Sequence, residues 1–164
     1  MIGRIVSKSA SKVKVMSLSW PTRAMSSTSI QRIGVDDPRM SRIVVNNGVV
    51  YISGQTDATG NTIEDQAKNV LDKVDKLLEE AGTNKSKLLT SSIWLKDIEN
   101  DFHGFNSVWI KWLDPHNKPV RATVESPMAR PILLIEVQVT AALDDWEWYK
   151  RESVGHALFF AGHE

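Results

Sequence analysis

Residues 119–137 read PVRATVESPMARPILLIEV, and they contain two runs that are typical of β-strands. The first, residues 119–124, is partly β-branched and is bounded by Pro119 and Pro127. The second, residues 132–140, is longer and more apolar. The sequence therefore predicts two strands joined by a short connection.

One charged residue lies inside each of these strands. Because successive side chains of a strand alternate between faces, Arg121 shares a face with Thr123, and Glu136 points away from the apolar face of its own strand. On adjacent strands, Arg121 and Glu136 could meet over one pocket. Arginine binds a carboxylate through two parallel hydrogen bonds, and glutamate can orient or activate a water molecule. By pattern alone, a solvated face or a structural ion pair is the more common explanation.

The rest of the chain predicts a small α+β domain. Asn46, Asn47 and Gly48 indicate a tight hairpin, and apolar residues at helical spacing follow Thr62 as far as Gly82. The predicted elements are strands at 42–45, 49–53, 87–95, 119–124 and 132–140, and helices at 62–82 and from Asn100 or Asp101 to about Leu113. This order, ββαβαββ, predicts a mixed sheet with both helices on one face. Alternation in residues 120–124 suggests that the other face meets a partner.

Four ordered segments within residues 41–143 resemble the RidA family, also called the YjgF/YER057c family or the reactive intermediate deaminases. They are residues 50–55 (VYISGQ), the helix 66–82 that ends in Glu-Glu-Ala-Gly, residues 95–106, and the pair of strands with Arg121 and Glu136. The amino-acid sequence of residues 106–143 is most similar to that of the YoaB-like branch. The resemblance implies a chorismate-mutase-like fold and a homotrimer with its sites at subunit interfaces.

The resemblance also implies the roles of individual residues. Arg121 corresponds to the carboxylate-binding arginine of the family and Glu136 to its water-orienting glutamate. The implied substrate-binding residues, besides Arg121, are Asn106, Thr123, Ser53 and Gly54. Four positions depart from the family. Thr123 stands where a cysteine is frequent, and Met40 stands where type members carry a tyrosine. Pro127 stands where a small or basic residue is usual, and Val137 follows the glutamate where Met or Ile is usual.

The activity implied by the resemblance is hydrolysis of reactive 2-imino or enamine acids to 2-oxo acids and ammonia. No metal or organic cofactor is needed, because an imine is already electrophilic. The alternative is a non-catalytic trimer that binds small carboxylic acids and acts as a sensor, a chaperone or the partner of an enzyme. The loss of the tyrosine at Met40 favours the alternative, whereas the retention of Glu136 favours catalysis.

Charge is unevenly spread along the 164 residues. The first 35 residues hold six of the 20 basic residues and none of the 20 acidic ones, which leaves 14 basic and 20 acidic residues in 36–164. A basic, serine-rich, acid-free segment is typical of an organellar transit peptide. We therefore expect a targeting segment at 1–30, a RidA-like domain at 31–143 and an extension at 144–164, with import into mitochondria; a plastid or the cytoplasm is the alternative.

Composition also bears on partners. The net negative charge of residues 36–164 argues against nucleic acid as a partner, because proteins that bind nucleic acid usually show a basic patch. The chain has no cysteine, and its four histidines lack metal-ligand spacing. No apolar run is long enough to cross a membrane.

Overall fold

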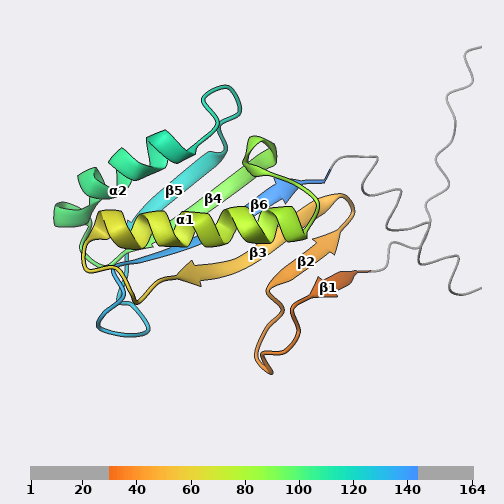
Figure 1. Ribbon diagram of the computed structural model, residues 1–164, viewed down its shortest axis with the longest axis horizontal. Helices are drawn as coiled ribbons and strands as arrows, with labels where there is room; N and C mark the ends of the chain where they lie inside the picture. The colour runs from red at the N-terminus through yellow and green to blue at the C-terminus, as the bar shows by residue number, and fades with distance from the viewer. Residues whose placement is uncertain (1–29, 144–164) are drawn as a thin grey trace, which may run out of the picture.

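A mixed sheet of six strands forms the frame of the protein in this computed structural model, which describes residues 30–143 (Figure 1). The predicted targeting segment, apart from Ile30, and the predicted extension at 144–164 lie outside the described residues. The strands run along the sheet in the order β1-β2-β3-β6-β4-β5. Their bounds are β1 Gln31–Ile33, β2 Ile43–Asn46, β3 Val49–Thr56, β4 Leu88–Leu95, β5 Val120–Glu125 and β6 Ile135–Ala142.

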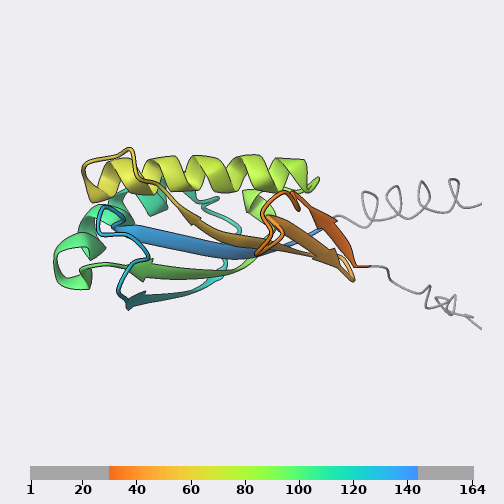
Figure 2. The same ribbon diagram turned by 90° about the horizontal axis from the view of Figure 1, so that it is seen from below.

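Both α-helices cover the same face of this sheet. α1 (Ile63–Glu80) packs on β3 and β6, and α2 (Ile98–Trp112) packs on α1 and β4. A short 3-10 turn, η1 (Lys85–Lys87), leads into β4. Figure 2 shows the two helices on one side of the sheet, and no described helix or strand covers the other side. The predicted α+β architecture is thus confirmed.

Local sequence signals explain where these elements begin and end. Asn47 and Gly48 both have positive φ, as a two-residue turn between β2 and β3 requires. Thr62 caps α1 by accepting a hydrogen bond from the backbone N–H of Asp65 at 3.2 Å. Gly82, at φ +80°, ends the helix as expected.

The core lies between the helices and the sheet. The alternation predicted for β6 is confirmed, because Ile135, Val137 and Val139 are almost fully buried while Gln138 is exposed. The helix side of the core comes from both helices and includes Ala67, Val70, Leu71, Val74, Leu78, Phe105 and Trp109.

Three expectations about the elements are corrected. An additional strand, β1, precedes the hairpin and pairs with β2, so the order is βββαβαββ. α2 begins at Ile98, because Asp97 provides the cap by accepting a hydrogen bond from the backbone N–H of Asn100 at 3.0 Å. The last strand begins at Ile135 rather than at Ile132, since the preceding residues form a turn.

The fourth correction concerns strand order. β5 and β6 follow one another in the chain, but β4 lies between them. β4 and β5 are parallel neighbours connected through α2, and β6 pairs antiparallel with β3 and β4. β6 buries every second side chain and occupies an interior position, whereas the largely exposed β5 forms the edge of the sheet.

A cluster of buried polar side chains anchors the loop between β3 and α1; we call Asp57, Gln66 and their partners the loop anchor. The Asp57 carboxylate accepts hydrogen bonds from Thr59, Gly60 and Asn69 and pairs with Lys73 at 3.2 Å. Burial acts to raise the pKa of Asp57, but these hydrogen bonds outweigh it and hold the pKa well below its usual range.

Gln66, the other buried member of the loop anchor, joins two loops. Its amide donates to the carbonyls of Gly60 (3.0 Å) and Ile132 (2.8 Å), and its oxygen accepts from the N–H of Leu134 at 2.8 Å. The side chain therefore ties the turn before β6 to the first turn of α1.

The uncovered face of the sheet is partly apolar. Val120, Ala122 and Val124 alternate with Arg121 and Thr123 along β5, and Val120 is 71% exposed. Tyr51 on β3 lies on the same face, paired with Thr140 of β6, and is 44% exposed. Exposed apolar side chains gathered on one sheet face are typical of a surface that meets another protein.

Candidate functional site

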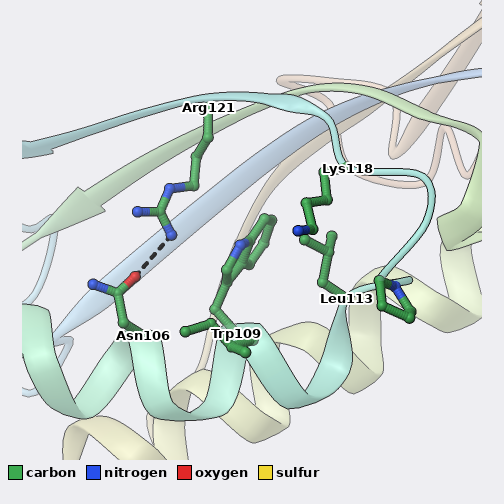
Figure 3. A pocket seen from close by; sticks show the side chains of 7 residues that line it. Asn106, Trp109, Leu113, Lys118 and Arg121 are labelled. Atoms are coloured by element: carbon green, nitrogen blue, oxygen red, sulfur yellow. Dashed lines mark hydrogen bonds between the residues drawn. The ribbon is translucent and has the colours of Figure 1, made fainter.

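Arg121 points from the edge strand toward the helices. Its register partner on β4 is Ser91, which is buried on the helix side of the sheet opposite Val139. The guanidinium donates a hydrogen bond from Nη1 to Oδ1 of Asn106 on α2 at 2.8 Å (Figure 3). Asn106 is thus brought to Arg121, although they lie on different elements.

Two aromatic rings of α2 lie against the guanidinium of Arg121. The Cζ atom of Arg121 lies 5.7 Å from the ring centroid of Phe105 and 5.6 Å from that of Trp109. Both rings are buried, and they contact one another at 5.8 Å between centroids. A cation over an aromatic face is attracted to its electrons, so the arginine is oriented before any ligand arrives.

The charge of Arg121 is not neutralised by the residues around it. Burial lowers its pKa, but an arginine remains cationic at neutral pH. Among residues 30–143, no carboxylate forms an ion pair with it. The guanidinium has five N–H donors, and one of its hydrogen bonds goes to Asn106. The remaining N–H groups can donate hydrogen bonds to an anion.

A pocket of about 550 Å³ opens beside Arg121 between α2 and the segment that leads into β5. This volume is within the range of small-molecule sites, roughly 300–1,000 Å³. The pocket is lined by Arg121, Asn106, Lys118 and the apolar residues Trp109, Ile110, Leu113 and Pro115 (Figure 3).

Two hydroxyl groups lie near Arg121 without a partner. Thr123 faces the same side of β5 as Arg121, and its Oγ1 is buried with no hydrogen bond among the described residues. Ser91 Oγ is also buried with no hydrogen bond among the described residues. Sequence reasoning named Thr123 but missed Ser91. The alternation of strand side chains could have identified Ser91 as buried, because it shares a face with Ile93 and Leu95, which are both almost fully buried.

Glu136 belongs to the opposite face of the sheet. It pairs with Trp94 on one side and with Thr56 on the other, and its neighbours Ile135 and Val137 face the helices. Its carboxylate occupies the space where a side chain of Gly54 would begin, with its Cδ 2.9 Å from that position. Gly54 therefore permits a close approach by Glu136.

Ser53 completes this second group of residues. It directly precedes Gly54 at the irregularity in the β3–β6 ladder, and its hydroxyl accepts a hydrogen bond from Nε2 of Gln55 at 3.0 Å. Met40, which corresponds to the family tyrosine, lies in the loop between β1 and β2 and is 47% exposed.

The predicted site thus falls into two halves within one chain. Arg121, Asn106 and Thr123 form the arginine half, on the helix side at the sheet edge. Ser53, Gly54 and Glu136 form the glutamate half, with the Glu136 side chain on the uncovered face. The expectation that Arg121 and Glu136 lie on adjacent strands is wrong, because β4 separates β5 from β6 and the two side chains point to opposite faces.

Other kinds of site find little support in residues 30–143. No group of three His, Cys, Asp or Glu side chains there is arranged to hold a metal ion. Neither α-helix in this range is long and apolar enough to cross a lipid bilayer.

Known proteins resemble this chain in both sequence and fold. The profile of the family described as endoribonuclease L-PSP matches residues 36–143. A RutC family protein of Haemophilus influenzae is 38% identical over 117 residues, which cover 69% of this chain and 97% of that protein. The RutC family protein YoaB of Escherichia coli is 33% identical over 107 residues, 65% of this chain and 93% of YoaB.

A solved structure shows the same architecture. The crystal structure of a YjgF family member from Neisseria meningitidis has a TM-score of 0.69 and 35% identity, covering 71% of this chain and 97% of the other. The motif around Arg121, the fold and these relatives agree, and the chain belongs to the endoribonuclease L-PSP family, which includes the YjgF or RidA proteins.

Proposed function

We propose that the protein is a deaminase that hydrolyses reactive 2-imino acids and their enamine tautomers. The observation that carries the proposal is Arg121: a cation braced by Asn106 and two aromatic rings, with no carboxylate partner among residues 30–143, at the edge of a pocket. Such an arginine is suited to hold the carboxylate of a small acid.

In the proposed reaction, water adds to the carbon of the protonated imine, and the carbon–nitrogen bond then breaks. The 2-iminium acid and one water molecule give a 2-oxo acid and an ammonium ion, so atoms and charge balance. Arg121 holds the carboxylate next to the reacting carbon, which fixes the substrate and favours attack from one side. Glu136 orients the water and accepts its proton during the addition.

The reaction needs the arginine half and the glutamate half together, and in one chain they occupy opposite faces of the sheet. We therefore propose that a second copy supplies the missing half, in a homotrimer with its sites at the subunit interfaces. The exposed Val120, Val124 and Tyr51 on the uncovered face support such an assembly, because burying apolar surface stabilises association.

A direct assay tests the enzyme proposal. An amino-acid oxidase or a pyridoxal-phosphate dehydratase generates imines in the presence of the full-length protein, and release of the 2-oxo acid is followed. We expect the wild type to accelerate release and Arg121→Ala to lose roughly 10- to 100-fold, because hydrogen bonds to a charged group contribute about 1.5–3 kcal/mol.

The matched control is Arg130→Ala, at an exposed arginine in the β5–β6 connection, which should keep full activity. Gel filtration of all three proteins checks that the assembly is intact. Equal activity of wild type and Arg121→Ala would refute the proposed role of the arginine.

A second function is a binding module for small carboxylic acids without turnover. The separation of the two halves favours it, because the arginine half by itself provides a carboxylate site with no catalytic glutamate. Calorimetry with 2-oxobutyrate distinguishes the two functions. Binding that depends on Arg121, together with no acceleration of imine hydrolysis, would support the module and reject the deaminase.

A further inference from the structure

Lys118 is a second cation in the pocket beside Arg121. It lies in the segment between α2 and β5, three residues before Arg121, and it lines the pocket together with Arg121. Strict alternation would place these two side chains on opposite faces. The alternation does not apply to Lys118, because this residue precedes β5, which begins at Val120.

The pocket has two positive charges and no negative one. No carboxylate is among its lining residues. In residues 30–143, Lys118 forms no ion pair. Asp114 is close in sequence, but its carboxylate is engaged by the backbone N–H groups of His116 and Asn117, at 2.8 and 3.1 Å.

An apolar wall accompanies the two cations. Trp109, Ile110, Leu113 and Pro115 make up the rest of the lining beyond Asn106. In the view of Figure 3, Trp109 rises from α2 between the side chains of Arg121 and Lys118. A ligand whose first carboxylate is held by Arg121 can therefore run its carbon chain along this wall toward the ammonium of Lys118.

We propose that Lys118 makes this pocket selective for 2-imino and 2-oxo acids that carry a second acidic group at the far end of the side chain. The inference rests on the proposed function, because Arg121 is taken to hold the first carboxylate. A monocarboxylic acid would pair with Arg121, and the Lys118 ammonium would remain hydrated. A dicarboxylic acid would satisfy both cations and cover the apolar wall with its chain.

The test compares two acids of equal chain length, 2-oxopentanoate and 2-oxoglutarate, which differ in the terminal carboxylate. Calorimetry on the full-length protein should show that 2-oxoglutarate binds about tenfold more tightly, which corresponds to about 1.4 kcal/mol. Lys118→Met keeps most of the side-chain volume and removes the charge. It should abolish the preference, because binding of 2-oxoglutarate should weaken far more than binding of 2-oxopentanoate.

Lys111→Met is the matched control, since Lys111 lies near the end of α2 and lines a different groove. It should keep the preference. The preference should also shrink as salt is added, because the Lys118 ammonium is exposed to solvent. Equal affinity of the wild type for both acids, or an equal loss of both in Lys118→Met, would overturn the proposal. So would a failure of 2-oxoglutarate to bind.

A parallel hydrolysis assay separates this inference from the proposed function. The imines of norvaline and glutamate, made in situ by amino-acid oxidases, have the same two carbon skeletons. Tighter binding of 2-oxoglutarate through Lys118 without any hydrolysis would keep the selectivity and reject the deaminase. Hydrolysis of both imines at equal rates, unaffected by Lys118→Met, would keep the deaminase and reject the selectivity.

Discussion

The loop anchor and the arginine half both contain buried polar groups, but they differ in how those groups are satisfied. In the loop anchor, the carboxylate of Asp57 and the amide of Gln66 find their partners within the same chain. In the arginine half, the guanidinium of Arg121 has one hydrogen-bonded neighbour, Asn106, and the hydroxyl of Thr123 has none among the described residues. The hydroxyl of Ser91, which lies beside this half on β4, also has none there.

This difference separates a structural role from a binding role. A buried polar group that is fully hydrogen-bonded adds specificity to the fold, and it offers nothing to a ligand. A buried or half-buried group with donors to spare is costly for the isolated protein and useful once a ligand arrives. Substitutions in the two regions should therefore change different measurements.

The largest effect is expected for Gln66→Leu. The substitution keeps the volume of the side chain but leaves two carbonyls and one N–H without their partner. We expect the free energy of unfolding to fall by about 3 kcal/mol, measured by urea unfolding at fixed protein concentration. Glu64→Gln, an exposed change on the same helix, is the control and should cost less than about 0.5 kcal/mol. A similar small cost for Gln66→Leu would erase the contrast between the two regions.

Asp57→Asn should have a smaller effect that depends on pH. The pKa of Asp57 is lower in the folded state than in the unfolded state, where it is about 3.9, so its charge stabilises the fold above that pH. This contribution is lost as the pH falls through the folded-state pKa. We expect the variant to be about 2 kcal/mol less stable at pH 7. The two proteins should converge in acid, and a constant difference between pH 7 and pH 2 would contradict this account.

Asn106→Ala should change binding and leave stability nearly intact. Without its hydrogen bond, the guanidinium of Arg121 is less firmly oriented over Phe105 and Trp109. We expect 2-oxopentanoate to bind about tenfold more weakly in calorimetry, a loss of about 1.4 kcal/mol. Ser107→Ala on the same helix should bind normally. A large loss of stability in Asn106→Ala, with binding unchanged, would place Asn106 with the loop anchor instead.

Ser91→Ala should have the smallest effect on stability. Its hydroxyl is buried without a hydrogen bond among the described residues, so its removal relieves a desolvation cost and leaves no partner behind. We expect the free energy of unfolding to stay within about 0.5 kcal/mol of the wild type or to rise slightly. A loss above about 1 kcal/mol would show that this hydroxyl is satisfied in solution.

The local structure was predictable from the sequence because its signals are local. Asn47 and Gly48 specified the hairpin turn, Thr62 and Gly82 bounded the first helix, and alternation placed Arg121 and Thr123 on one face. Strand order could not be obtained in this way, because it depends on contacts between distant segments. The assumption that consecutive strands are neighbours put Arg121 beside Glu136, whereas β4 separates them.

The candidate site was predictable to a similar extent. Asn106 was identified through the resemblance to the RidA family, and the structure brings it to Arg121. Lys118 was missed because a residue that precedes a strand does not follow the alternation of that strand. Ser91 was missed because alternation predicts that it is buried but does not show that its hydroxyl lies beside Arg121, which depends on the pairing of β4 with β5.

The contact between Gly54 and Glu136 also restricts how this protein can evolve. A methyl group at position 54 would collide with the Glu136 carboxylate, which occupies that space. A descendant that loses the glycine must move or shorten the acidic side chain, and one that has lost the glutamate is released from the need for glycine. The two positions are therefore expected to influence each other over evolutionary time, because a lineage that keeps the glutamate and gains a larger residue at position 54 must turn the carboxylate away from its present place.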